Sequence, residues 1–202
     1  SSTYRITLTG TVEGNGMTIR GNTLVSGENL TSAGMFAQIG RSATQVGTVM
    51  NLNLQPNNVT FNSTNSVGGL AGIARYANIY NVSITSENNL TINGNNFVGG
   101  LIGRAELSYD FKNLSSSVNA VANYKPTTDL TFTDNGGSAN EVSYAGGVVG
   151  YLGRGNANEL YSNNVQNVMG DKAGFVVGVV GSSANVSRVY SSVSSTATIK
   201  AY

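Results

Sequence analysis

The chain has 202 residues, enough for one domain or one repeat array with a sizeable core, and it carries a net charge of +1 with only 10% charged residues. This balance excludes both a disordered polyelectrolyte and a protein attracted to nucleic acid by charge alone. There is no Cys and no His, which excludes disulfides, thiol catalysis and a Ser-His-Asp triad, and we expect neither a cofactor nor a metal.

The chain opens at Ser1 without a signal-peptide pattern, so we expect any export signal to have been removed or to lie outside this sequence. No apolar run approaches the roughly 18 residues of a membrane span. Residues 6–9 alternate apolar and Thr side chains, which predicts a half-buried strand. Glu13–Gly16 (Glu-Gly-Asn-Gly) predicts a turn, and the strand resumes at Met17–Ile19.

A glycine-spaced apolar motif then recurs along the chain. Val67–Gly72 (Val-Gly-Gly-Leu-Ala-Gly) returns as Val98–Gly103, as Ala145–Gly150 and, degenerate, as Ala173–Gly178, and a worn copy at Ala33–Gln38 precedes them. The last residues of the five copies are spaced by 34, 31, 47 and 28 residues. A period near 30 indicates one structural unit stacked on copies of itself. Because glycine permits close backbone packing, its regular placement favours a structural role over a flexible loop.

Each motif is followed by an alternating strand and, in most repeats, by a third short strand. The second strands are expected at 49–54, 79–84, 111–114, 160–163 and 186–189, and the third at 59–61, 90–92, 130–132 and 197–199. Helical patterning is absent. Three strands per unit predict an all-β parallel β-solenoid of about five to six coils, in one domain over 1–202, with repeats near 33–66, 67–97, 98–145, 146–173 and 174–202.

Asn51, Asn81 and Asn113 fall at equivalent places in successive second strands. Stacking in a solenoid predicts a ladder of side-chain amides that satisfies buried polar groups from coil to coil. The ladder is expected to lapse in the last two repeats, at Ser162 and Arg188.

The ordered series resembles GLUG-type repeats. Thr11–Ile19 is similar to the Gly-Thr-Phe-Asp-Gly-Asn-Gly-His-Thr-Ile opening that precedes them, with Met17 in place of His. Ala33–Phe36, Val67–Gly72, Val98–Gly103 and Ile79–Val82 match the repeats themselves, whereas Phe175 replaces a motif glycine. The resemblance spans about residues 4–202. It implies a right-handed parallel β-helix from a large secreted or surface-attached bacterial protein, adhesin-like or, in some members, part of a secreted peptidase; it transfers no catalytic residue.

The acidic residues give little support to an enzyme. Polysaccharide hydrolases on β-helices need paired carboxylates, and a calcium-dependent lyase needs a cluster of them. Only Glu106 with Asp110, and Asp129 with Asp134, lie close in sequence. We therefore expect no enzymatic activity.

Arginines follow the glycine motif within one to four residues, so a solenoid would place them near one edge, and tyrosines lie close by. The candidate binding residues are Arg41, Arg75, Arg104, Arg154, Tyr76, Tyr109 and Tyr151. Arg pairs bidentately with carboxylate or sulfate and Tyr stacks on sugar rings, which points to acidic glycans. The alternative is that each Arg covers apolar surface in a solvated turn.

The 103-to-150 interval is about 16 residues longer than the one before it, and the extra residues fall within 119–143. Insertions in solenoids emerge as loops on one face, often a binding face; variable padding is the alternative. The sequence thus predicts an adhesin-like stalk or multivalent surface, secreted or on the bacterial surface, that contacts host or bacterial glycans or proteins. A polysaccharide-degrading enzyme and an accessory segment of a secreted peptidase are the alternatives.

Overall fold

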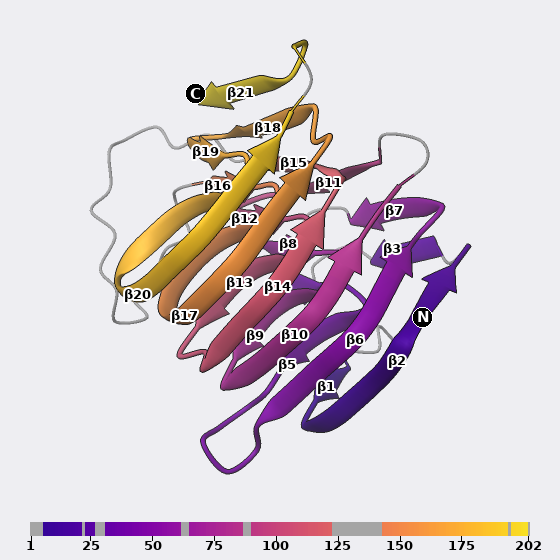
Figure 1. Cartoon of the computed structure of the whole chain (residues 1–202), viewed down its shortest axis with the longest axis vertical. Coiled ribbons are helices and arrows are strands. Elements are labelled where there is room, and N and C mark those ends of the chain that lie inside the picture. Colours follow the sequence, from indigo (N-terminus) through magenta and orange to yellow (C-terminus); the bar gives the residue numbers. More distant parts are fainter. Residues whose placement is uncertain are drawn as a thin grey trace.

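A computed structural model describes residues 6–21, 23–26, 31–61, 65–86, 90–122, 143–193 and 195–201. These residues form a stack of coils with no helix, and the chain climbs steadily from the first coil at one end to the last coil at the other (Figure 1). All pairings between the named strands of the described ranges are parallel. The prediction of a parallel β-solenoid is confirmed, with about five turns.

Each coil has four walls. The short wall contains the start of the glycine motif in β4 (Ser32–Ala33), β8 (Ser66–Gly68), β12 (Phe97–Gly99), β16 (Tyr144–Gly146) and β19 (Lys172–Gly174). The motif wall follows with β1 (Thr7–Leu8), β5 (Phe36–Ile39), β9 (Ala71–Arg75), β13 (Ile102–Glu106) and the first halves of β17 (Val149–Asn163) and β20 (Val177–Ser192).

The polar wall carries the second predicted strands. It comprises β2 (Gly10–Arg20), β6 (Gly47–Gln55), β10 (Ala77–Ile84), β14 (Asp110–Ser116) and the second halves of β17 and β20. The closing wall contains β11 (Thr91–Gly94), β15 (Asn119–Ala122), β18 (Asn167–Gly170) and β21 (Thr198–Ala201), with the pair β3 (Thr23–Ser26) and β7 (Asn58–Phe61) at its beginning.

The strand register confirms that the motif copies are equivalent. Val67 pairs with Val98, Val98 with Ala145, and Ala145 with Ala173. The motif glycines are required by close backbone contact between coils, because a Cβ on Gly68 would overlap the Leu101 carbonyl oxygen. This confirms the structural role predicted for them.

Each unit has four strands and not the predicted three, because the glycine motif, expected as one strand, divides between the short wall and the motif wall. Three further details of the predicted repeat were wrong. The first motif copy is one residue shorter than the others, since Ala33 pairs with Val67 but Phe36 pairs with Ala71. In the fourth second strand, Leu160 pairs with Leu114, so Ala157–Leu160 and not 160–163 is the equivalent segment. The predicted turn at 13–16 is a bulge inside the continuous strand β2, because Glu13 pairs with Met50 while Met17 pairs with Leu52.

The closing wall also differs from expectation in one coil. Its strand in that coil is β15, in register with β11 at Thr91 and Asn119. The strand expected at 130–132, and residues 123–142 of the expected insertion loop, lie outside the described residues.

The core lies inside the four walls and is built from stacked aliphatic rows. Leu52, Val82, Leu114 and Leu160 stack in one row of the polar wall, each at most 3% exposed. Burying such a side chain contributes about 1.5–3 kcal/mol relative to leaving it in water. Within the described part of the chain, no helix is long and apolar enough to cross a bilayer.

Candidate functional site

The polar wall bends outward at one residue in each strand. Asn51, Asn81 and Asn113 have φ values of 55°, 52° and 54°, in the left-handed region that Asn tolerates better than most residues. In β10 this conformation sets Tyr80 and Asn81 outward in succession, while Ile79 and Val82 point to the core. The same bend in successive strands hollows a trough that runs along the solenoid axis.

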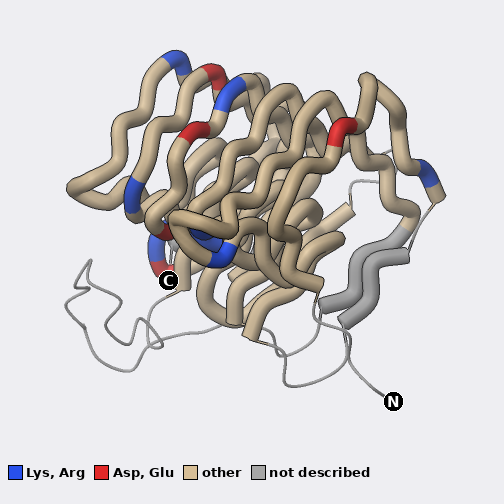
Figure 2. The backbone as a smooth tube through the Cα atoms, turned by 90° about the horizontal axis from the view of Figure 1, so that it is seen from below, with Lys and Arg blue, Asp and Glu red and all other residues tan. Residues whose placement is uncertain are grey.

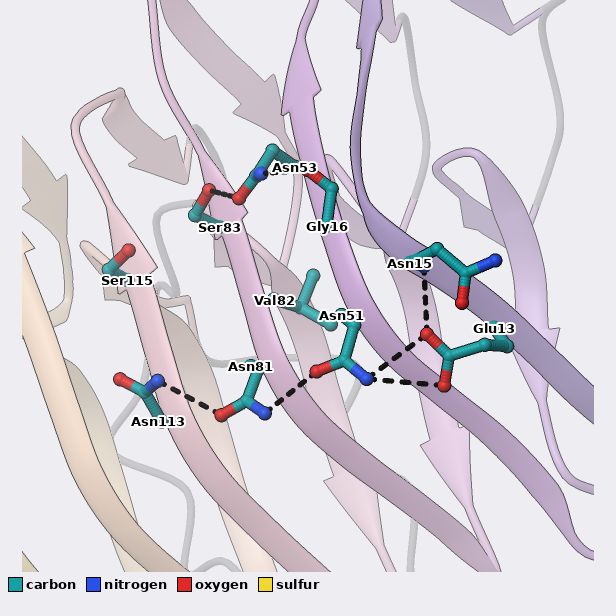
Figure 3. Close-up of a pocket in the computed structure, with 10 residues that line it drawn as sticks. All are labelled: Glu13, Asn15, Gly16, Asn51, Asn53, Asn81, Val82, Ser83, Asn113 and Ser115. Carbon is teal, nitrogen blue, oxygen red and sulfur yellow. Dashed lines mark hydrogen bonds between the residues drawn. The ribbon is translucent and has the colours of Figure 1, made fainter.

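A ladder of side-chain hydrogen bonds runs along this trough (Figure 3). Asn113 Nδ2 donates to Asn81 Oδ1 at 3.0 Å, and Asn81 Nδ2 donates to Asn51 Oδ1 at 2.8 Å. Asn51 Nδ2 donates in turn to both carboxylate oxygens of Glu13, at 3.0 and 3.2 Å. The predicted amide ladder is confirmed, but it lies on the outer surface and not among buried groups, since Asn81 and Asn113 are exposed.

A second polar row lies two residues further along each strand. Ser83 Oγ donates to Asn53 Oδ1 at 2.6 Å, and Asn53 Nδ2 donates to the Gly16 carbonyl at 3.2 Å. Ser115 continues this row in register with Ser83. The two rows line a trough of about 660 Å³ together with Asn15 and Val82 (Figure 3).

The ladder ends at an ion pair. The residues in register with Asn113 in the last two coils are Glu159 and Arg188, which share its left-handed conformation with φ values of 60° and 52°. Arg188 Nη2 lies 3.2 Å from Glu159 Oε1, and Arg188 Nε donates to Asn158 Oδ1 at 2.9 Å. The predicted break at Arg188 is correct, whereas the break assigned to Ser162 falls at Glu159.

Five of the seven predicted binding residues lie at the corner between the motif wall and the polar wall. Arg75 and Tyr76 form this corner in one coil, Arg75 Cζ lies 5.9 Å from the Tyr76 ring centre, and Tyr76 meets Tyr109 edge-on at 5.9 Å. Gly40, just before Arg41, packs against the carbonyl oxygens of Arg75 and Tyr76. Arg154 lies where β17 passes from one wall to the other.

The other two, Arg104 and Tyr151, lie in register on the outer side of the motif wall. Tyr151 is 2% exposed and packs on Phe97 and Tyr144, with ring centres 5.9 and 5.7 Å away. Arg104 Cζ lies 5.0 Å from the Phe97 ring centre, and Arg104 Nε is 3.1 Å from Glu106 Oε1, although its N–H is not aligned for a hydrogen bond. Tyr151 is therefore a buried packing residue, whereas the Arg104 side chain packs on Phe97 and remains 24% exposed.

Two tyrosines have raised pKa values. Burial, and then the negative charge of Asp171, raise the pKa of Tyr144. Burial also raises the pKa of Tyr80, on the polar wall, with the charge and a hydrogen bond of Asp110 adding to it. In both cases the neutral phenol is favoured.

The acidic residues that the structure describes are dispersed. Glu106 pairs with Arg104 and Asp110 interacts with Tyr80, while Asp129 and Asp134 lie outside the described residues. Across the described ranges, no group of three or more acidic side chains gathers as a metal site would require.

The trough residues Glu13, Asn15, Asn53, Ser83 and Ser115 were not singled out from the sequence. The available signal was the Asn-x-Asn and Asn-x-Ser pattern at 51–53, 81–83 and 113–115, which places one outward polar residue at each bend and another two residues later. Chemically, the trough presents amide and hydroxyl groups, which donate and accept hydrogen bonds, with one carboxylate at its end.

The walls and stacked rows define the chain as a parallel β-solenoid with a polar, axially repeated outer surface. Comparisons with protein-family models, curated proteins and solved structures find no match.

Proposed function

We propose that the chain is an adhesin-like segment of an exported bacterial protein, in which the solenoid is both a stalk and a multivalent contact surface. The observation that carries the proposal is the axial repetition of surface chemistry: the same outward amide recurs in register in β6, β10 and β14 of the polar wall. A ligand that repeats along its own length can meet several coils at once, so weak contacts accumulate.

Two further observations support a stalk. The motif glycines bring backbones of adjacent coils into direct contact, and the aliphatic row that begins at Leu52 runs without interruption from β6 to Leu160 in β17. Such an array gains length by adding coils, each stabilised mainly by its neighbours. The resemblance of Val67–Gly72 and Val98–Gly103 to GLUG repeats points to the same class of secreted or cell-surface protein.

Figure 2 shows few charged residues, spread over the backbone trace. Weak, additive hydrogen bonding is therefore a better basis for adhesion by this surface than strong charge attraction. The trough on the polar wall and the corner that contains Arg75 and Arg154 are the two candidate contact surfaces.

The test is binding of the labelled chain to bacterial cells, host cells and a broad glycan panel, with the same glycans assayed for released reducing ends and unsaturated sugars. We expect saturable binding that persists without product release. Turnover of any glycan would replace this proposal with the carbohydrate-active enzyme, and absence of binding to every cell and glycan would overturn the adhesive role.

A further inference from the structure

We propose that the trough on the polar wall is a binding site for an extended, uncharged carbohydrate chain lying along the solenoid axis. The trough would then be the contact surface of the adhesin-like solenoid proposed above, and its assignment rests on that function. Its lining comes from four successive strands, β2, β6, β10 and β14.

The geometry of the trough selects a long and repetitive ligand. Adjacent strands of a sheet are about 4.8 Å apart, so the three spacings from β2 to β14 extend the site over about 14 Å. The ladder places an equivalent amide at Asn51, Asn81 and Asn113 along that length. A linear polymer of similar units can therefore make the same contact in successive coils.

The chemistry of the lining selects hydroxyl groups. Eight of the ten lining residues are Asn, Ser or Gly, and Val82, the one apolar side chain among the ten, is 1% exposed. A lipid or an apolar peptide would leave these polar groups unpaired. Sugar hydroxyls both donate and accept, which matches an amide surface.

Charge argues against acidic polymers in this trough. The ten lining residues include no Lys or Arg, and Glu13 places a carboxylate at one end. Charged groups near the site are Lys112 and Asp110 on β14 and the Glu159–Arg188 pair beyond the last amide. A polyanion would meet Glu13 without a cation in the trough to offset it, so uncharged glycans are favoured over uronic acid or sulfated chains.

The amides are also ordered before any ligand arrives. Each Asn has two N–H donors and one carbonyl, and the ladder uses one donor and the carbonyl of Asn81 to hold the side chain in place. The other N–H of this exposed side chain is left for a ligand. Because the side chain is already fixed, binding loses less rotamer entropy than it would at a mobile amide.

The test uses the full chain and immobilised glucans, mannans and galactans beside uronic acid and sulfated glycans. The trough variant is Asn81→Gly with Ser83→Ala, in which glycine accepts the left-handed backbone that Asn81 adopts. The matched control is Asn185→Ala, which removes another amide–amide hydrogen bond, to Asn156 Oδ1, on the same wall outside the trough.

We expect the unaltered chain to prefer an uncharged glycan, the trough variant to bind it at least about tenfold more weakly, and the control to remain within about twofold. Unchanged binding by the trough variant would overturn the site while leaving the adhesive function standing. Binding only to acidic glycans that is lost in the double variant Arg75→Ala/Arg154→Ala would also overturn the trough as the site and leave the adhesive function standing. Binding to neither glycans nor cells would instead remove the proposed function itself, whereas binding to protein receptors alone would overturn only the carbohydrate assignment.

A second measurement does not depend on the variant folding. In the ¹⁵N-labelled chain, the side-chain amide signals of Asn51, Asn81 and Asn113 should shift on addition of the selected oligosaccharide, and that of Asn185 should not. Shifts confined to residues outside the trough would contradict the site.

Discussion

At the scale of single residues, the left-handed asparagines have two structural tasks. Their backbone turns the strand outward, and their amides link adjacent coils through hydrogen bonds of 2.8 and 3.0 Å. Glycine would allow the outward bend but could not form the amide hydrogen bonds. A β-branched residue such as Val would provide neither. The recurrence of Asn at 51, 81 and 113 follows from the need for both.

Asn81 can separate the two tasks by substitution. Asn81→Gly keeps the backbone and loses the amide bonds, at a cost of about 1 kcal/mol of unfolding free energy. Asn81→Val must also hold a β-branched residue at a φ near 52°, and should cost about 1–3 kcal/mol more. Urea unfolding followed by circular dichroism measures both, and a Val variant as stable as the Gly variant would contradict the backbone argument.

The raised pKa of Tyr144 makes the unfolding free energy of the chain depend on pH in the alkaline range. Its pKa is raised above 10.0 in the folded chain, so the folded state holds the phenolic proton more tightly than the unfolded state. The resulting stabilisation is present below about pH 10 and is lost as pH rises through the folded pKa. The unfolding free energy should therefore fall less between about pH 8 and pH 10.5 in Tyr144→Phe than in the unaltered chain. Parallel losses in both proteins would show that Tyr144 titrates normally.

At the scale of elements, the motif glycines set the distance between coils. Gly100 packs on the Gly147 carbonyl and Gly147 on the Phe175 carbonyl, so the motif copies stack backbone to backbone. The strands of the motif wall begin directly after these contacts. A side chain at these glycines would push whole coils apart.

Two glycine-to-alanine changes test this contact. In Gly147→Ala the new methyl would meet the Phe175 carbonyl oxygen, part of a backbone that cannot move alone, and we expect a loss of about 1–3 kcal/mol in unfolding free energy. In the control Gly170→Ala, the nearest atom is the Ala145 side chain at 3.2 Å, and the loss should be clearly smaller. Thermal or urea denaturation gives the comparison, and equal losses would show that the close contact does not limit coil spacing.

The sequence was sufficient for the repeat, the second and third strands of the early coils and the ladder, because each depends on a local pattern of apolar, Gly and Asn residues; it did not show that the glycine motif divides between two walls. It failed where the pattern was diluted. Ala157 and Glu159 replace the large apolar residue and the Asn of earlier coils. The predicted second strand of this coil was therefore placed three residues too late, at 160–163. The Asn-x-Asn and Asn-x-Ser pattern indicated the polar lining of the trough, but not its depth, which comes from the left-handed backbone at each Asn.

The same limit applies to the outer aromatic cluster of Phe97, Tyr144 and Tyr151. Phe97 is distant in sequence from Tyr144 and Tyr151, and the three residues belong to two walls. Close packing of the short and motif walls at Gly103 and Gly150 brings them together, and that contact is not visible in a strand pattern. Tyr151 was therefore assigned to a binding surface when it is a packing residue.

At the scale of the whole molecule, the coils differ in how much of their surface is buried against neighbouring coils. Central strands such as β10 alternate between buried and partly exposed residues, whereas β20 in the last coil has no fully buried position and exposes Val180, Val189 and Tyr190. Each central coil has a neighbour on both sides, while the last described coil has one.

Hydrogen exchange should report this inequality. Amides of β10 and β14 are expected to exchange at least about tenfold more slowly than those of β20 and β21, because opening an end coil breaks one interface and opening a central coil breaks two. Mass spectrometry of native-state exchange gives the profile. Uniform protection would indicate that the coils unfold as a single cooperative unit.

The register on either side of residues 123–142 has a practical consequence. Thr91 pairs with Asn119 before this segment, and Phe97 pairs with Tyr144 after it. The strands on both sides thus keep the regular register although one coil contains more residues than the other. The joint between the closing wall and the short wall thus accommodates extra chain without shifting a strand. A foreign peptide, an affinity tag or a small reporter domain could be spliced in at this joint, making the solenoid a rigid scaffold for display.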